Sequence, residues 1–265
     1  MSWSRRSFLS TVSTTPLALA PLGARVTGAG ISQAAAAPAS FPVHDPALVQ
    51  EVVGVAHRDL ARVRELVGGR PTLANAAVDW GFGDWESALG AASHVGNRDI
   101  AEYLIAHGAR PTLFSAAMLG QLDIVKAFVA LSPGCQRIKG PHGIPLLSHA
   151  QAGGDRAKAV YDYLLALGDA GERPALQPLS SADRDRLIGT YAYGPGSDEQ
   201  FEISAQRDFL VIARKGRVNR NLMHVGSLEF FPVGAESVRI RFSSDALTVT
   251  IRDAAINVIA RRIAS

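Results

Sequence analysis

The sequence GNRDIAEYLIAHGA, at residues 96–109, decides the expected fold of the first half of the chain. Its apolar residues recur at helical spacing, and a glycine stands where such a helix would end. Similar stretches begin at residues 58 and 120, and a looser one covers residues 160–168. Short segments rich in small residues precede the last three copies, at residues 87–93, 111–117 and 144–150. The repetition predicts pairs of helices stacked side by side.

These helix pairs resemble the ankyrin repeat, whose first helix carries the consensus Thr-Pro-Leu-His-Leu-Ala-Ala and whose second helix ends in Gly-Ala. Residues 111–117 read PTLFSAA, and Gly108-Ala109 closes a second helix. The resemblance covers residues 46–170 and implies an ankyrin-type α-solenoid of about four repeats, a general protein-binding scaffold. The spacing is irregular, because the copies at Gly96 and Gly120 lie closer together than the family's ~33 residues.

Residues 1–39 are predicted to be an export signal. The run SRRSFLS, at residues 4–10, resembles the twin-arginine translocation signal, which has Lys where Ser10 stands. A moderately apolar stretch follows, and small residues at positions 35–39 suit cleavage after Ala39. The apolar stretch is too short and interrupted to span a membrane. The resemblance implies export of the folded protein to the periplasm, or otherwise out of the cytoplasm, with no integral membrane segment after cleavage.

Composition narrows the function classes. The chain has 265 residues, 47% of them hydrophobic, which is ample for a packed core and excludes a wholly disordered chain. The net charge of +3 comes from Arg5, Arg6 and Arg25, because residues 1–39 hold no acidic residue. The remainder is neutral, so no nucleic-acid partner is expected. The single cysteine, Cys135, excludes an intramolecular disulfide and a multi-cysteine metal cage.

Beyond a linker at residues 171–179, the apolar pattern changes to a period of two. Residues 238–242 and 247–252 alternate cleanly, and turn signals separate seven or eight such strands. Residues 180–265 are therefore predicted to form a separate antiparallel domain, a small curved sheet or open β-barrel. The whole chain would be a multi-domain α plus β protein.

Three short runs in this second domain carry a further resemblance. Residues 187–191, 201–203 and 228–230 resemble the accessory β domain of bacterial penicillin-recognising serine hydrolases. The Ser-x-x-Lys nucleophile motif of those enzymes is absent from the sequence. The resemblance therefore implies a shared accessory module without hydrolase activity.

The connection over residues 70–86 ends in DWGFGDWE, three aromatic residues spaced by glycines. Aromatic side chains on loops are frequent binding hot spots, so we expect a partner-binding edge here, together with the turn at residues 139–143. The alternative is that the aromatic rings fold inward and cap a helix edge. The predicted partner-binding residues are Trp80, Phe82, Asp84, Trp85 and His142, with His94 and His149 facing the same groove.

The same region holds groups that suit a metal or acid–base site: Asp79, Asp84, Glu86, His94, His142 and His149. No pair among them shows ligand spacing such as His-Glu-x-x-His or His-x-His. The sequence therefore predicts no catalytic residue, no metal and no cofactor.

Taken together, these patterns predict an exported binding protein that contacts an unidentified protein partner through the loop-bearing edge. The alternative is an enzyme or small-ligand-binding protein that uses a Trp/His/Asp groove on the same edge. A basic turn provides a third hypothesis, contact with the cell envelope, although a solvated charged turn is its default interpretation. Its residues are Arg214, Lys215, Arg217 and Arg220.

Overall fold

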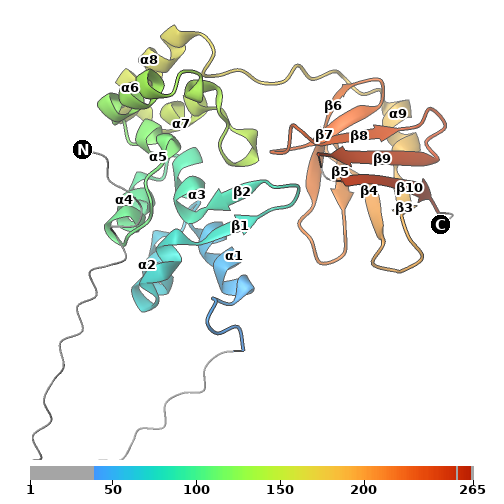
Figure 1. Ribbon diagram of the computed structural model, residues 1–265, viewed down its shortest axis with the longest axis horizontal. Helices are drawn as coiled ribbons and strands as arrows, with labels where there is room; N and C mark the ends of the chain where they lie inside the picture. The colour runs from blue at the N-terminus through green and yellow to red at the C-terminus, as the bar shows by residue number, and fades with distance from the viewer. Residues whose placement is uncertain (1–38, 255, 264–265) are drawn as a thin grey trace, which may run out of the picture. The chain divides into compact units, whose positions relative to one another are not determined.

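Helices fill the first part of the described chain, and antiparallel strands fill the second (Figure 1). The computed structural model describes residues 39–254 and 256–263, and from Pro42 onward the chain is one compact unit. The expected export signal at residues 1–39 lies outside the described residues, apart from Ala39. Within the described residues, helices are too short or too polar to cross a membrane.

The helices are short. They are α1 Pro46–Val55, α2 Leu60–Gly69, α3 Ala88–His94, α4 Arg98–Ala106, α5 Leu113–Met118, α6 Leu122–Leu131, α7 Leu146–Ala152, α8 Lys158–Leu167 and α9 Ser181–Leu187. Single 3-10 turns lie between them at Pro71–Asn75, Cys135–Arg137, Pro141–Gly143 and Gly154–Ala157. A two-stranded hairpin, β1 Ala77–Asp79 and β2 Trp85–Ser87, is inserted ahead of α3.

Polar side chains set where several helices begin. Asp59 accepts a hydrogen bond from the Arg62 amide at the start of α2, and Ser87 accepts one from the Gly90 amide at the start of α3. Thr112 and Ser115 form a reciprocal capping box at α5. Each cap satisfies backbone N–H groups that lack a partner in the first helical turn. The start of α3 therefore follows directly from the residue that ends β2.

The ankyrin-type α-solenoid predicted from the repeated segments is wrong. Successive helix pairs begin at Pro46, Ala88, Leu113 and Leu146, so their steps are unequal, and the β1–β2 hairpin separates the first pair from the second. The buried side chains of the helical part also divide into two clusters, one containing Leu89 and another containing Leu146. A solenoid needs one regular step and one continuous layer. The chain is instead a mixed α and β protein in which the strands after α9 form a barrel.

The second correction concerns the strands, which form a closed barrel rather than a curved sheet or open barrel. Its strands are β3 Gly189–Ala192, β4 Gln200–Gln206, β5 Phe209–Ala213, β6 Arg220–Gly226, β7 Glu229–Pro232, β8 Arg239–Phe242, β9 Thr248–Asp253 and β10 Ile256–Arg262. The barrel closes where Arg261 and Arg262 of β10 pair with Ala192 and Tyr191 of β3. Closure is favourable because it leaves no unpaired sheet edge.

Aromatic and branched side chains fill the barrel. Tyr191 is fully buried, and its ring lies 5.9 Å from that of Phe201 and 5.7 Å from that of Phe242. The Tyr191 hydroxyl lies 3.0 Å from the Leu187 carbonyl oxygen and 3.1 Å from that of Ala246, so its single proton has an acceptor within the barrel. The period of two seen in the sequence is thus the alternation between interior and exterior of the barrel.

Charged contacts join the helical part to the barrel. Arg220, the first residue of β6, forms an ion pair with Asp84 beside β2. The Lys139 ammonium lies 2.6 Å from a carboxylate oxygen of Glu236. Arg220 and Asp84 are both almost fully buried, so their pairing fixes this junction more firmly than an exposed ion pair would.

Two glycines offer a matched test of the helix packing. Gly96 and Gly108 both have positive φ, at 77° and 91°. A Cβ on Gly96 would overlap the carbonyl oxygen of Ala152 at the end of α7, whereas a Cβ on Gly108 would meet open space. We expect Gly108→Ala to lower the free energy of unfolding by about 1–2 kcal/mol through backbone strain alone.

We expect Gly96→Ala to cost at least about 1 kcal/mol more than Gly108→Ala, because the end of α7 must move as well. Urea unfolding of both variants beside the parent measures the difference. Equal losses would show that the close approach of the α3–α4 turn to the end of α7 contributes nothing.

Candidate metal centre

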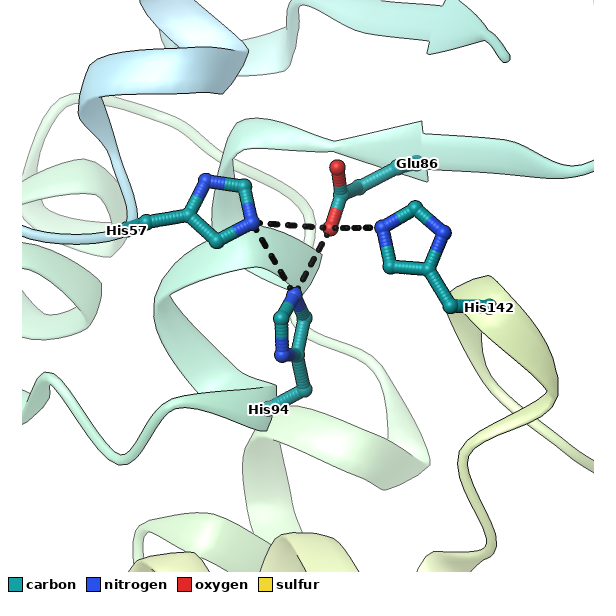
Figure 2. Close-up of side chains that lie close together, drawn as sticks. All are labelled: His57, Glu86, His94 and His142. Carbon is teal, nitrogen blue, oxygen red and sulfur yellow. Dashed lines mark hydrogen bonds and ion pairs between the residues drawn. The ribbon is translucent and has the colours of Figure 1, made fainter. Parts of the chain in front are cut away.

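Three histidines and one glutamate from four separate segments converge on one point (Figure 2). His57 lies in the turn after α1, and Glu86 is the middle residue of β2. His94 is the last residue of α3, and His142 lies in the 3-10 turn Pro141–Gly143. We call these four residues the His/Glu cluster. Each offers one ligand atom, and the four atoms lie within 4.8 Å of one another.

The distances centre on a single carboxylate oxygen, Oε1 of Glu86. The Nε2 atom of His94 lies 2.9 Å from it, that of His142 3.3 Å and that of His57 3.5 Å. The Nε2 atoms of His57 and His94 are themselves 3.1 Å apart. Two ligands bound ~2.1 Å from a tetrahedral zinc ion are separated by ~3.4 Å, so these four separations are close to the edge length of such a coordination polyhedron.

Hydrogen bonding alone accounts poorly for this arrangement. A carboxylate oxygen has two lone-pair sites, whereas three imidazole nitrogens face Oε1 of Glu86. The close nitrogens of His57 and His94 also compete for one proton, because two N–H groups facing each other repel. A cation among the four atoms would satisfy all of them with their lone pairs.

The hairpin register turns Glu86 inward. Val78 pairs with Glu86, and Asp79 pairs with Trp85. Neighbouring residues of a strand point to opposite faces, so Glu86 is fully buried while the adjacent Trp85 is 62% exposed. Ser87 then caps α3, whose length carries His94 to the same point. Local backbone geometry therefore brings Glu86 and His94 together without any sequence motif.

His142 is held in an uncommon backbone conformation. Its φ of 60° and ψ of 20° lie in the left-handed region, which few residues other than glycine adopt. The His142 amide donates to Oδ1 of Asp84 at 2.8 Å, and its Nδ1 lies 2.8 Å from Oδ2 of the same carboxylate. Asp84 thus contacts both the backbone amide and the ring of His142. Such conformations concentrate at functional sites, where surrounding contacts maintain them.

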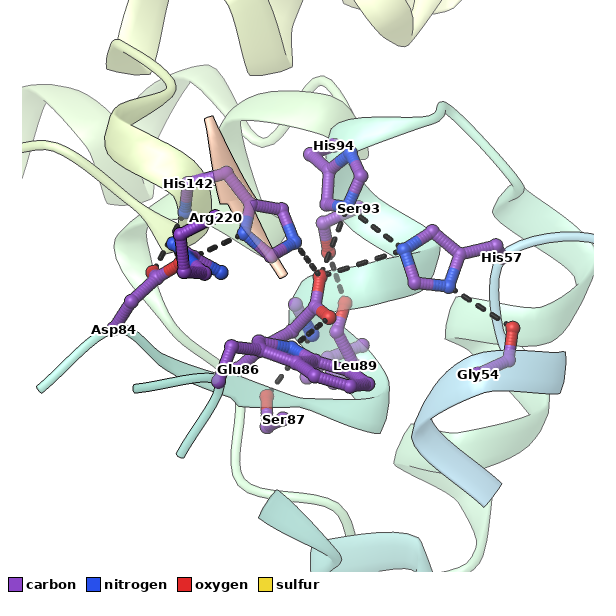
Figure 3. A network of polar contacts seen from close by, with 12 residues as sticks. Gly54, His57, Asp84, Glu86, Ser87, Leu89, Ser93, His94, His142 and Arg220 are labelled. Atoms are coloured by element: carbon purple, nitrogen blue, oxygen red, sulfur yellow. Dashed lines mark hydrogen bonds and ion pairs between the residues drawn. The ribbon is translucent and has the colours of Figure 1, made fainter. Parts of the chain in front are cut away.

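A second layer of polar contacts orients the cluster (Figure 3). The Nδ1 atom of His57 lies 3.0 Å from the Gly54 carbonyl oxygen, so an N–H there leaves the Nε2 lone pair toward the centre. Asp84 acts in the same way on His142. The Trp80 indole N–H donates to the outer oxygen of Glu86 at 2.7 Å. Hydrogen bonds of this kind to the far atoms of ligands are the usual support of a metal site.

The charges of the cluster are strongly coupled. Burial raises the pKa of Glu86, but hydrogen bonds from His142, His57 and His94 outweigh it and hold the pKa well below its usual range. Burial lowers the pKa of His142, yet its bonds to Asp84 and Glu86 raise it to about 9. The hydrogen bond to Glu86 also raises the pKa of His57. Without a metal ion, the buried carboxylate therefore takes its countercharge from protonated imidazole.

The structure separates the residues predicted to bind a partner. Asp84, His94 and His142 come together in or beside the cluster, with Trp80 half-buried against the helical core. Trp85 and Phe82 remain exposed, so of the three aromatic residues only Trp80 turns inward, and partner binding by the loop stays a prediction. Arg220, expected on a solvated turn, is instead 5% exposed, because it pairs with Asp84.

His149 takes no part in the cluster. It is fully buried on α7, its Nδ1 lies 3.1 Å from the Pro145 carbonyl oxygen, and its ring packs 4.8 Å from that of Phe114. Burial lowers its pKa to about 4, so it is neutral at pH 7. His149 is a core residue, not part of a groove with His94.

Sequence reasoning missed His57 altogether and set Glu86 aside for want of ligand spacing. Their convergence supports a metal site, against the expectation of none. The one sequence signal was the gathering of Asp79, Asp84, Glu86 and His94 within one stretch of the chain.

No family model and no curated protein matches the chain. The resemblances to the ankyrin repeat and to the accessory domain of serine hydrolases are thus unsupported, and neither carries an argument about function.

The raised pKa of His142 predicts how the metal-free protein responds to pH. A histidine whose pKa is 6.5 unfolded and about 9 folded stabilises the fold fully below pH 6.5, and this contribution is lost as pH rises through 9. We expect the free energy of unfolding to fall by on the order of 2 kcal/mol over this window, allowing for solvent screening.

Urea unfolding in the presence of a chelator, at intervals from pH 6 to pH 9.5, measures this loss. In His142→Gln the decline should flatten, whereas the exposed His107→Gln variant should keep the parent's slope. A parent profile with no decline would contradict the assignment.

Proposed function

We propose that this protein binds one divalent first-row transition-metal ion through His57, Glu86, His94 and His142. The observation that carries the proposal is the approach of three Nε2 atoms to one buried carboxylate oxygen, with two of those nitrogens 3.1 Å apart. Protein side chains that already converge this closely need little rearrangement to hold an ion.

The donor set indicates the class of metal. Imidazole suits zinc, copper, iron and nickel, and a carboxylate is compatible with each of them. Calcium and magnesium prefer sites made of oxygen atoms alone, so they fit three histidines poorly. The lone cysteine, Cys135, belongs to a different core cluster and does not contribute a thiolate.

Residues around the His/Glu cluster would orient the ligands of the ion. The Gly54 carbonyl and the Asp84 carboxylate hold His57 and His142 in the tautomer that presents Nε2 to the centre. Trp80 restrains Glu86 by binding its outer oxygen, leaving Oε1 for the ion. A bound ion would replace the imidazolium protons as countercharge to Glu86, so it would stabilise the fold.

Metal binding is tested on the full chain after removal of metals with a chelator. Cobalt(II) titration, followed by its visible spectrum and by competition with zinc, should give one site per chain. We expect His94→Ala to weaken zinc binding by at least tenfold, because a ligand is lost, and His107→Ala to leave it unchanged. Equal affinity in both variants, or no binding by the parent, would refute the proposal.

A second variant keeps the test valid if His94→Ala misfolds. Asp84 is not a proposed ligand, and Asp84→Asn should still weaken zinc binding about 10–100-fold by releasing the His142 ring. The stoichiometry should stay at one ion per chain. Near-ultraviolet circular dichroism shows whether each variant keeps the parent's packing. An Asp84→Asn variant that packs like the parent and binds zinc equally would contradict the role of this carboxylate.

Protein binding through the β1–β2 hairpin is a second candidate function. It is supported by Trp85, which is 62% exposed on β2 beside the buried Glu86. We expect Trp85→Ala to abolish partner capture with little loss of stability, while Leu131→Ala, at a position 84% exposed elsewhere, has no effect. Cross-linked affinity capture with both variants measures this, and equal capture would rule out the hairpin.

Export by the twin-arginine route stays a prediction from residues 1–39. The route carries folded proteins, so an ion bound in the cytoplasm would travel with the chain. Cell fractionation of the parent beside an Arg5→Lys/Arg6→Lys variant tests it, and identical distribution of the two would contradict export by this route.

A further inference from the structure

A cavity of about 600 Å³ lies at one mouth of the barrel. The ends of β3, β5 and β9 and the beginnings of β4, β6 and β10 meet there, as expected for one end of an antiparallel barrel. The β1–β2 turn, with Trp80 and Phe82, lines the opposite side. We call this space the barrel cavity. Its volume falls within the ~300–1,000 Å³ typical of small-molecule sites.

The walls of the barrel cavity are apolar and partly aromatic. Phe201, Ile212 and Ile251 extend the barrel core into it. Large apolar side chains also remain exposed along its lining, with Phe82 36%, Val218 43% and Ile256 54% exposed. Apolar residues gathered around an opening favour an apolar occupant, because covering them removes their surface from water.

Arginines supply the positive charge of the lining. Arg214 and Arg217 are exposed on the loop between β5 and β6, and Arg220 begins β6. Arg220 is only 5% exposed, and its buried Nε atom has no hydrogen-bond partner among the described residues. The charge of Arg220 is paired with Asp84, so Arg214 and Arg217 are the exposed cations of the lining.

Each acidic residue of the lining accepts a hydrogen bond from a nearby backbone amide. Asp79 accepts a hydrogen bond from the Gly81 amide, and Asp253 accepts one from the Ala254 amide. Arg214 donates to the Asp198 carbonyl oxygen and lies 5.6 Å from the Tyr193 ring centre. Arg217 is therefore the exposed cation best placed to meet an incoming anion.

From this combination we propose that the barrel cavity binds a small amphipathic anion, a carboxylate or sulfonate carried on an aliphatic or aromatic body. The body would cover the apolar walls, and the anionic head would meet the arginines of the β5–β6 loop. None of the four residues of the His/Glu cluster lines this cavity, so the proposal does not depend on metal binding.

Two residues nevertheless touch both places. Trp80 lines the barrel cavity and donates its indole N–H to Glu86. Arg220 lines the cavity and pairs with Asp84, which holds His142. An occupant of the cavity would thus lie against residues that support the cluster from outside.

The test uses the chelator-treated full chain and the fluorescent sulfonate 8-anilinonaphthalene-1-sulfonate, displaced by dodecanoate. We expect saturable binding at one site, with dodecanol displacing the probe at least tenfold less well than dodecanoate. Absence of saturable binding overturns the proposal. Equal displacement by dodecanol overturns the requirement for an anion.

Variants on the exposed β5–β6 loop locate the site without disturbing the core. Arg217→Glu and Val218→Asp should each weaken dodecanoate binding at least fivefold, through loss of the cation and through added negative charge. Arg261→Glu makes the same charge change at an exposed position of β10 that does not line the cavity. Its affinity should stay within twofold of the parent's. Equal weakening by Arg217→Glu and Arg261→Glu would show that binding depends only on the overall surface charge, and it would refute the proposed site.

Discussion

The buried carboxylate of Glu86 is the constraint around which the helical part of this protein is arranged. A carboxylate without solvent is strongly unfavourable unless its charge is compensated and its oxygens are bonded. Glu86 is fully buried, so its compensation must come from the protein or from an ion. His57, His94 and His142 face one oxygen and Trp80 binds the other. The Glu86 carboxylate thus links four segments: the turn after α1, the β1–β2 hairpin, α3 and the Pro141–Gly143 turn.

Asp84 extends this constraint to the barrel. It lies two residues before Glu86, holds His142 through both its backbone and its ring, and pairs with Arg220 at the start of β6. Arg220 also donates to the Val233 carbonyl oxygen, so the guanidinium is shared between the hairpin and the barrel wall. Burial of this pair makes it costly to break, because either partner alone would leave an uncompensated charge. The position of His142 therefore depends on the contact between Asp84 and Arg220 of the barrel.

The sequence predicted the local elements better than their assembly. Alternation at residues 238–242 and 247–252 correctly indicated strands, since an interior of apolar side chains imposes a period of two. Closure was not predicted, because pairing of Tyr191 with Arg262 joins residues far apart in the chain and no local pattern encodes it. The repeated helices suggested a regular solenoid, but the inserted hairpin and unequal steps prevent one. The cluster was missed for the same physical reason: its four ligands come from four segments, so no fixed spacing records their convergence.

Several energetically unfavourable features lie together at the His/Glu cluster. A charged group with no solvent, a histidine with left-handed backbone and two imidazole nitrogens 3.1 Å apart each cost free energy in isolation. In natural proteins such conflicts are expected where function has selected the arrangement, since packing alone would remove them. An apolar residue at position 86 could be buried without three histidines around it. The proposed cation at their centre would account for the placement of all four groups, with Asp84, Gly54 and Trp80 aligned behind them.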